Sequence, residues 1–457
     1  MHNIIKTINP TTEEIIKEYE YYNISQVRNI IDSVALEQDK WKKQNLKLRI
    51  NSIKKLSQAL NENKQDLATC ITNEMGKPIS QSISEIEKCI ILCEYYINNS
   101  EKFLKPSIIS NEFPKSYYTY TSSGIIFGIM PWNFPVWQVM RFAIPNLIIG
   151  NAILLKHSPN TTEMSLKLEQ LFNNALPKNL FKSLLIEVNM AESVIKDSKV
   201  SGVTITGSKK AGANVAMLSG ANIKKCVLEL GGNDPYIILE DADIDLAVRE
   251  CVNSRLLNTG QVCIAAKRII ICKSLKSKFE KKLIECVKKF QYSNPTLPNS
   301  KLGPIARKDL KKSISNQVEN SLKNGSKCIY KSSIPDGKGY YYPVTILTDV
   351  DKNNVAFKEE LFGPVFSITY VDDTQQAIQY ANMSEYGLSA VLFTENIEKG
   401  ENICLNDLNF GTCNLNKMVS SDPRLPFGGV KNSGFGRELS EIGLKEFANL
   451  KTINITK

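Results

Sequence analysis

Residues 203–212 read Val-Thr-Ile-Thr-Gly-Ser-Lys-Lys-Ala-Gly, a β-branched run followed directly by glycine and serine. β-Branched residues favour strands, whereas glycine and serine favour the turn from which a helix starts. The pattern continues on both sides, with short apolar runs at 152–156, 184–188, 227–230 and 236–239 and helical stretches at 162–175 and 210–219. This alternation predicts βαβ units, a mostly parallel sheet, and ligands at the carboxyl ends of its strands.

A second alternation of the same kind follows toward the C-terminus. Its expected elements are helices at 244–257, 277–290 and 374–383 and strands at 268–272, 342–347, 366–370 and 390–393. Residues 1–105 instead carry apolar side chains at three- and four-residue spacings, which is typical of amphipathic helices. Residues 116–130 and the tail 447–457 are rich in strand formers and predict extended structure. The fold class is therefore α/β.

Length and composition indicate an ordinary globular protein. The chain has 457 residues, of which 42% are apolar and 23% charged, and this length leaves room for about two to four domains. No apolar stretch approaches the roughly 20 residues of a membrane span, and residues 1–6 lack the layout of a signal peptide. We therefore expect a cytoplasmic protein with no membrane partner.

Charge and side-chain counts exclude other classes. The net charge is +10, but lysine and arginine are spread along the chain with no run of five like charges. We therefore expect no nucleic-acid partner. With only two histidines and no Cys-x-x-Cys among 11 cysteines, we expect no metal site and mostly buried, reduced thiols.

The glycine at the end of the 203–206 run is a candidate phosphate-binding turn. No G-x-G-x-x-G fingerprint occurs, and residues 207–212 are not a P-loop. The free amides and positive dipole end at a helix start there would suit a pyrophosphate. A strand–helix turn with a serine cap accounts for the segment equally well.

Cys263 has the most suggestive setting of the cysteines. It lies in Asn-Thr-Gly-Gln-Val-Cys-Ile-Ala-Ala at 258–266, where small and amide residues between a helix and a strand predict an approachable loop. A nucleophilic thiol also needs a local positive potential or hydrogen-bond donors. A buried, unreactive thiol remains the alternative.

Two further segments supply groups for such chemistry. Glu229 stands in an apolar strand before Gly231 and Gly232, where desolvation would raise its pKa toward that of a general base, unless it is an exposed edge residue. Asn133 precedes Pro135, which we expect to start a helix, so its amide could donate to an oxyanion. Trp137 and Arg141 follow at spacings of four, on the same face.

Six motifs in order resemble the aldehyde dehydrogenase superfamily. They are Pro131–Pro135, Gly207-Ser208, Glu229–Gly232, Gly260–Cys263, Glu359–Pro364 and Pro426–Gly429. The resemblance covers nearly the whole chain, and residues 421–438 make it most like the bacterial succinate-semialdehyde dehydrogenase branch. It implies a Rossmann-type open parallel sheet in a cofactor domain at 1–111 and 128–228, a second α/β catalytic domain at 229–430, and a small β oligomerisation arm at 112–127 and 431–457. Unpaired strand edges of that arm imply a homodimer or homotetramer.

The resemblance assigns the chemistry residue by residue. Cys263 would attack an aldehyde as a thiolate, and the Asn133 amide with the Cys263 N–H would hold the oxyanion of the thiohemiacetal. After hydride transfer to NAD or NADP, Glu229 would activate the water that hydrolyses the thioester. The presence of this base favours the free acid over acyl-CoA as the product.

The implied cofactor residues lie in five separate stretches of the chain, the last of them the motif at 359–364. They are Trp132, Lys156, Ser158, Pro159, Gly207, Ser208, Leu230, Glu360 and Phe362. NAD-preferring relatives carry glutamate at the position of Pro159, where it would repel a 2′-phosphate. We therefore expect both NAD and NADP to be used.

The implied substrate is a small semialdehyde, most simply succinate semialdehyde. Arg141 occupies the position of the arginine that binds the substrate carboxylate, although a surface arginine is the alternative. Phe134, Trp137 and Phe427 would wall an aromatic tunnel. A second family arginine is replaced by Leu257, which leaves Arg424 as a candidate substitute. An uncharged aldehyde as substrate, or a non-catalytic protein with the same fold, remain the competing hypotheses.

Overall fold

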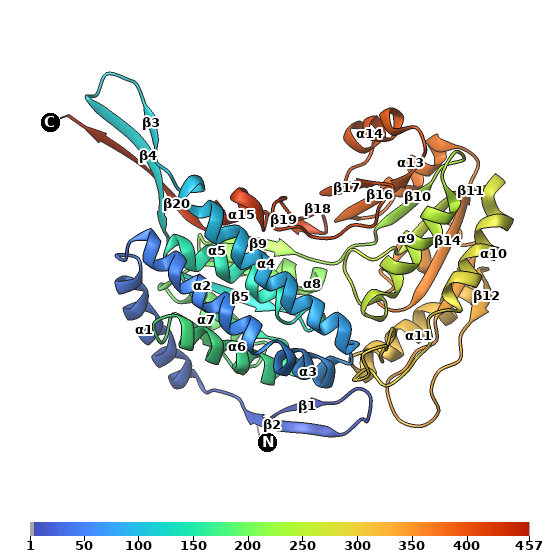
Figure 1. Cartoon of the computed structure of the whole chain (residues 1–457), viewed down its shortest axis with the longest axis horizontal. Coiled ribbons are helices and arrows are strands. Elements are labelled where there is room, and N and C mark those ends of the chain that lie inside the picture. The colour runs from blue at the N-terminus through green and yellow to red at the C-terminus, as the bar shows by residue number, and fades with distance from the viewer. Residues whose placement is uncertain (1–3, 457) are drawn as a thin grey trace.

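The computed structural model describes residues 4–456, which form two α/β units and a projecting three-stranded arm (Figure 1). In Figure 1 the six-stranded unit lies at left, the seven-stranded unit at right, and the arm extends from the first unit. The predicted α/β fold with a parallel cofactor-type sheet and a second α/β unit is confirmed.

The first sheet has the order β19-β9-β8-β5-β6-β7 and is parallel except for β19. Its strands are β5 (Ile125–Met130), β6 (Ala152–His157), β7 (Phe181–Ser183), β8 (Val200–Thr206), β9 (Lys225–Glu229) and β19 (Gly434–Phe435). The carboxyl ends of β5, β8 and β9 lie side by side, because β5 pairs with β8 and β8 with β9. Residues 131–133, 207–208 and 229–230 are therefore brought to one edge.

Helices cover this sheet on both sides. They are α1 (Ile24–Trp41), α2 (Leu46–Glu62), α3 (Lys64–Met75), α4 (Ile79–Phe103), α5 (Trp137–Ile149), α6 (Thr162–Ala175), α7 (Ala191–Lys196), α8 (Lys209–Ala221) and α15 (Ser440–Lys445). Every residue of α5 is buried, so this helix crosses the interior of the molecule. It places Trp137, Gln138 and Arg141 between the edge of the first sheet and the second unit.

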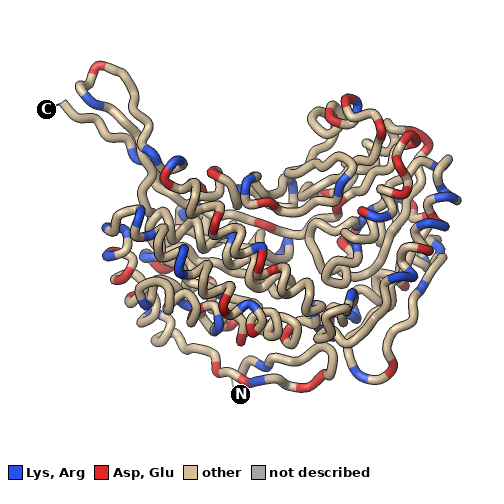
Figure 2. Tube along the Cα trace, viewed as in Figure 1, with Lys and Arg blue, Asp and Glu red and all other residues tan. Residues whose placement is uncertain are grey.

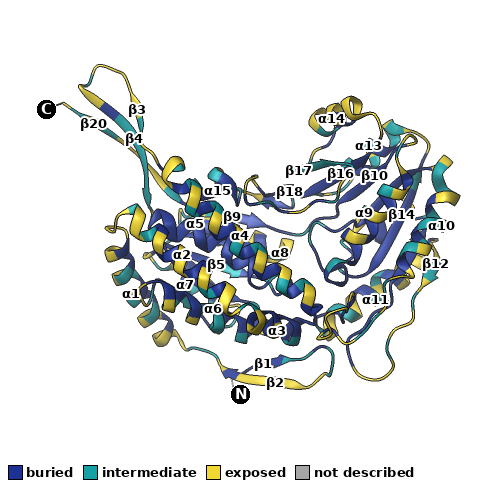
Figure 3. Cartoon of the chain, viewed as in Figure 1, coloured by how far each residue is buried: buried dark blue, intermediate teal, exposed yellow. Residues whose placement is uncertain are grey.

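The second sheet has the order β12-β13-β14-β11-β10-β16-β17, parallel except for β12. Its strands are β10 (Pro235–Ile238), β11 (Arg268–Cys272), β12 (Lys327–Lys331), β13 (Thr345–Thr348), β14 (Val365–Val371), β16 (Ser389–Phe393) and β17 (Thr412–Leu415), and its helices are α9 (Ile244–Leu256), α10 (Lys276–Val287), α11 (Lys308–Lys323), α12 (Val355–Lys358), α13 (Thr374–Asn382) and α14 (Ile397–Asn406). Alternate residues enter different cores: Ile269 and Ile271 pack on one face, whereas Ile270 packs on the other. A sheet apolar on both faces needs helices on both, as Figure 3 shows.

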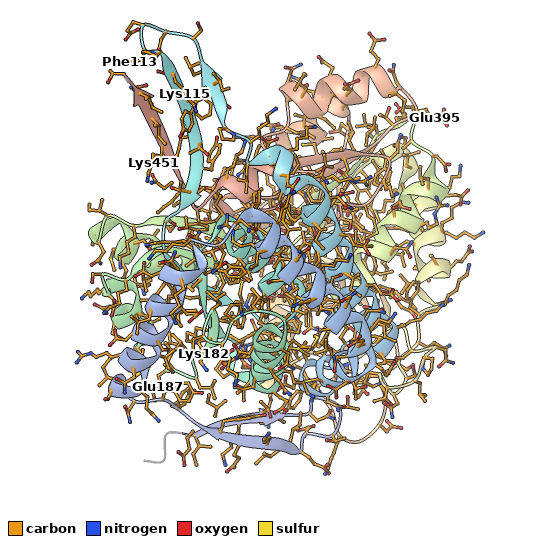
Figure 4. All side chains as sticks on the ribbon, turned by 60° about the vertical axis from the view of Figure 1, so that its left-hand side comes forward. Phe113, Lys115, Lys182, Glu187, Glu395 and Lys451 are labelled. Atoms are coloured by element: carbon orange, nitrogen blue, oxygen red, sulfur yellow. The ribbon has the colours of Figure 1, made fainter. Side chains whose placement is uncertain are left out.

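The arm is a three-stranded antiparallel sheet of order β20-β4-β3, with β3 (Ser107–Ile109), β4 (Lys115–Ser122) and β20 (Ala448–Ile455). Figure 4 shows Phe113 near its tip and Lys115 and Lys451 on its strands, standing away from the body. Smaller pairings join β1 (Ile4–Ile8) to β2 (Ile15–Glu20) and β15 (Tyr386–Gly387) to β18 (Val430–Lys431).

Several predicted boundaries differ from the structure. The expected arm segment 112–127 overlaps β5, whose pairing with β6 and β8 places it inside the six-stranded sheet. Within the expected tail segment 431–457, β19 pairs with β9 and only β20 joins the arm. The apolar run 184–188 follows a strand and is not itself one, since β7 ends at Ser183.

In the trace of Figure 2, Lys and Arg are interspersed with Asp and Glu along the whole length of the chain that the structure describes. Among residues 4–456, no helix combines the length and hydropathy that crossing a membrane requires.

Candidate active site

The loop that carries Cys263 is held in an unusual backbone conformation. Asn258, Thr259 and Gly260, just after α9, all have positive φ angles of 49°, 54° and 78°. Such angles are rare for a β-branched residue, so the surrounding contacts must compensate for strain at Thr259. Its hydroxyl donates to the Gly303 carbonyl and accepts from the Gly303 N–H, both at 3.0 Å. A Cβ at Gly260 would lie 2.2 Å from the Gly363 carbonyl oxygen, so only glycine fits there.

Cys263 lines two cavities. The first, of about 250 Å³, is also lined by Phe134, Trp137, Arg141 and Phe427. The second, of about 290 Å³, is lined by the predicted cofactor residues Trp132, Gly207, Ser208, Leu230, Glu360 and Phe362, together with Asn133. The structure thus places this thiol at the junction of the expected substrate side and the expected cofactor side.

The loop after β5 carries Asn133 toward Cys263. Its Nδ2 donates to the Gln261 carbonyl at 3.1 Å, and its Oδ1 accepts from Gln138 Nε2 at 3.0 Å. These contacts fix which end of the amide is the NH2 group, and they use one of its two N–H bonds. Asn258 Nδ2 donates to the Asn133 carbonyl at 3.0 Å, tying the two loops together.

The helix expected to start at Pro135 instead starts at Trp137. The N–H groups of Val136 and Trp137 each donate to Glu85 Oε1 at 2.9 Å. A carboxylate from α4 therefore caps α5 and delays its first turn. Asn133 consequently lies in the turn that precedes the helix.

Glu229 ends β9 and is 2% exposed. Burial raises the pKa of its carboxyl to about 8, partly opposed by the nearby Arg141 guanidinium. Within the described residues its Oε1 has no hydrogen-bond partner, although that atom is buried. A carboxyl whose pKa lies near neutrality, with a free oxygen, suits a general base. The same carboxylate contributes to raising the pKa of Cys263, which places the two groups within electrostatic reach.

Arg141 forms more ion-pair and hydrogen-bond contacts within the protein than the sequence suggested. Its Nε forms an ion pair with Glu438, its NH2 donates to Thr206 Oγ1 at 3.1 Å, and the same nitrogen lies 3.8 Å from Glu229 Oε2. The guanidinium is buried and lies over the Phe427 ring. Arg141 lines the first cavity, but two carboxylates already share its charge.

Burial dominates the titration of the Cys263 thiol. It raises the pKa to about 11, opposed by the positive charges of Lys267 and Arg141. The Lys267 side chain is fully buried; it donates to the Cys263 carbonyl and pairs with Glu360 Oε1 at 2.8 Å. Glu360 also accepts from the Gly232 N–H at 3.3 Å. Lys267 therefore links the loop that carries Cys263 to a predicted cofactor residue.

The strand ends fit an anionic nucleotide. Lys156 is 5% exposed and forms no ion pair within residues 4–456, and burial lowers the pKa of its ammonium. A buried cation without a counter-charge is suited to a polar or anionic ligand. Ser208 caps α8, accepting from Ala211 N at 3.3 Å, and Pro159 is exposed with no carboxylate in its place. These residues fit the ribose and pyrophosphate of a dinucleotide.

The predicted substrate residues separate into two groups. Phe134, Trp137, Arg141 and Phe427 line the cavity of Cys263, as does Leu257. Arg424 does not: its side chain is 76% exposed and pairs with Asp422 at 2.6 Å. Its two-residue spacing from Asp422 lets the pair form locally, in solvent.

The sequence reasoning missed several residues at the site. They are Lys77, Glu85, Lys88, Gln138, Lys267 and Glu438. Glu438 ends the stretch 421–438 that resembles the succinate-semialdehyde dehydrogenase branch, which could have marked it; the others have no local pattern that distinguishes them from surface polar residues. In the part of the chain that the structure describes, no cluster of His, Cys, Asp and Glu could hold a metal ion.

Known proteins similar to this chain share both sequence and fold. Residues 2–453 match the Aldehyde dehydrogenase family. The succinate semialdehyde dehydrogenase [NAD(P)+] Sad of Escherichia coli (strain K12) is 40% identical over 450 residues, covering 98% of this chain and 97% of that protein. A probable succinate-semialdehyde dehydrogenase [NADP(+)] of Synechocystis sp. is 38% identical over 450 residues, covering 98% and 99%.

Among solved structures, succinic semialdehyde dehydrogenase from Streptococcus pyogenes in complex with NADP+ superposes with a TM-score of 0.96 at 32% identity, covering 99% of this chain and 100% of that one. This chain belongs to the aldehyde dehydrogenase family.

Proposed function

We propose that this protein oxidises a small semialdehyde, most simply succinate semialdehyde, to the carboxylic acid with NAD or NADP as oxidant. The observation that carries the proposal is the position of Cys263, which lines both the cavity of the expected cofactor residues and the aromatic cavity. The names of the relatives support the substrate and the cofactor.

In the first half of the reaction the Cys263 thiol loses its proton to solvent water, and the sulfur of the resulting thiolate bonds to the aldehyde carbon. The oxygen of the resulting thiohemiacetal carries the negative charge. The free N–H of the Asn133 amide and the backbone N–H of Cys263 would donate to it, because charge develops there in the transition state. A bound oxidised nicotinamide supplies the hydride acceptor. Loss of hydride from the thiohemiacetal carbon leaves a thioester on Cys263.

In the second half the thioester is hydrolysed. Glu229, with its unpaired Oε1, would take a proton from water as the water oxygen attacks the thioester carbon. The carbon–sulfur bond then breaks, releasing the acid and the thiolate. Burial raises the pKa of the carboxyl to about 8, so the fraction available as base grows as the pH rises through about 8.

Residues near the expected cofactor ribose support use of both cofactors. Lys156 and Ser158 supply a cation and a hydroxyl, and Pro159 supplies no carboxylate that would repel a 2′-phosphate. Trp132 and Phe362 are in edge-to-face contact, with centroids 5.8 Å apart, in the wall of the second cavity. They would bound the space for the nicotinamide, whose ribose Glu360 would bind.

The arm supports association into a homodimer or homotetramer. Both outer strands, β3 and β20, have an unpaired edge within the described chain, and Ile108, Ile109 and Leu450 are exposed on them. Strand edges and apolar side chains of this kind are covered when a second subunit packs on them.

The test is a panel of aldehydes with each cofactor, followed by the appearance of reduced nicotinamide. We expect kcat/KM for succinate semialdehyde to exceed that for hexanal, and Cys263→Ala to abolish turnover of both. A preference for hexanal would replace the proposed substrate with an uncharged aldehyde, in keeping with the apolar walls of the first cavity. Turnover by Cys263→Ala would overturn the mechanism.

A further inference from the structure

Lys88 places an ammonium group in the wall of the cavity that also contains Cys263. It lies on α4, one turn after Glu85. Its Nζ donates to Ser421 Oγ at 2.8 Å and lies 4.3 Å from the centroid of the Trp137 ring. The nucleophilic thiol and this ammonium therefore face the same enclosed space.

The other two cations of this wall are paired with carboxylates. Lys77 Nζ lies 2.5 Å from Glu85 Oε2, with both side chains 1% exposed. Arg141 forms its ion pair with Glu438 and lies near Glu229. Each pair largely cancels its own charge inside the cavity wall.

Lys88 has no such partner: it forms no ion pair with any carboxylate in residues 4–456. The nearby Asp422 is already paired with Arg424. Burial lowers the pKa of the Lys88 ammonium to about 8, so the group is still mainly charged at neutral pH. The Trp137 ring face and one hydroxyl compensate only part of the lost hydration. An anionic ligand in the cavity would supply the missing counter-charge.

We propose that Lys88 binds the carboxylate of the semialdehyde while its aldehyde carbon lies at Cys263. This assignment rests on the proposed function and names the residue that gives it selectivity for an acidic aldehyde. Leu257, in the same cavity, supplies no charge, and Arg424 lies outside it. Ser421 Oγ accepts from Lys88, so its own proton is free to be donated to the same carboxylate.

The test compares succinate semialdehyde with butanal, which has the same number of carbons and no carboxylate. Lys88→Met removes the charge and keeps the length of the side chain. A charge-assisted hydrogen bond is worth about 1.5–3 kcal/mol, so we expect KM for succinate semialdehyde to rise about 10- to 100-fold. KM for butanal should stay within about twofold. Lys88→Arg should recover most of the loss, and Lys102→Met, on the exposed face of α4, is the matched control.

The outcomes separate this assignment from the proposed function. If the wild type does not prefer succinate semialdehyde to butanal, the proposed function fails and the role of Lys88 fails with it. If the wild type does prefer it, and Lys88→Met leaves that preference unchanged or impairs both substrates equally, Lys88 is not the carboxylate ligand. A thermal melt reports the folding of each variant, and Lys88→Gln replaces Lys88→Met only if the melt shows that the latter does not fold.

Discussion

Arg141 NH2 lies 3.8 Å from Glu229 Oε2, and both side chains are almost completely buried. The guanidinium moderates the rise in the Glu229 pKa that burial alone would cause. Arg141 is itself oriented by its ion pair with Glu438. The group proposed as base is thus tuned by an arginine that the sequence had suggested for substrate binding.

The rate of thioester hydrolysis should rise with pH through about 8. Because the pKa of the Glu229 carboxyl is raised to about 8, the group is mostly protonated below pH 8 and cannot accept a proton from water. Above pH 8 it is mostly ionised and can accept that proton. The measurement is the steady-state rate of cofactor reduction, taken after the initial burst of reduced cofactor, as a function of pH. Glu229→Gln should remove this pH dependence and slow turnover by about 10²–10⁴-fold, while a burst of reduced cofactor remains. An absent burst would place Glu229 in the first half of the reaction instead.

Asn133→Ala should lower kcat by about 10²–10³-fold, the usual effect of losing one oxyanion donor. Binding of NADP+, followed by fluorescence titration, should be unchanged, because the cofactor contacts proposed here do not use the amide. A thermal melt controls for loss of the hydrogen bonds to Gln261 and Gln138. A fall in kcat of less than about fivefold would remove Asn133 from the reaction.

Lys267→Met should lower the free energy of unfolding by about 3 kcal/mol, since it leaves Glu360 without its partner in a largely buried setting. It should also raise KM for the cofactor, because Glu360 loses the contact that orients it. Lys273→Met is the control: it removes an exposed pair with Asp372, which should contribute about 0–1 kcal/mol. Equal effects of the two substitutions in urea titrations would contradict a special role for Lys267.

Pro159→Glu should change the choice of cofactor. A carboxylate at this exposed position would lie near Lys156 and repel a 2′-phosphate, and such like-charge contacts cost several kcal/mol. We expect kcat/KM for NADP to fall by about 100-fold or more while that for NAD is retained. Pro177→Glu, at another exposed proline, should change neither. If the wild type already prefers NAD by more than about a thousandfold, roughly 4 kcal/mol, the premise fails before the substitution is made.

Local patterns were sufficient for most elements of the two sheets. The predicted strand 268–272 and the predicted helix 162–175 match β11 and α6 residue for residue. The strand has an apolar β-branched run at 269–271 and lies between Lys267 and Lys273, and the helix keeps apolar residues at three- and four-residue spacings, at Met164, Leu168, Leu171 and Ala175. Prediction was poorer where a distant segment of the same chain sets the boundary of an element. Helix α5 is one case, because Glu85 of α4 caps it, and β5 is another, because it joins the six-stranded sheet and not the arm.

The motifs around Cys263, Asn133 and Glu229 identified candidate reacting groups, because side-chain chemistry and short spacings are written in the chain itself. Local sequence does not tell whether a charged side chain is free or neutralised, since that depends on which distant side chain is buried beside it. Arg141 meets Glu438 and Lys267 meets Glu360 through packing that no local spacing encodes, whereas Arg424 pairs with Asp422, two residues away, and stays in solvent. Folding is what leaves Lys88 without a carboxylate partner among residues 4–456, because desolvation and Coulomb energies act through space.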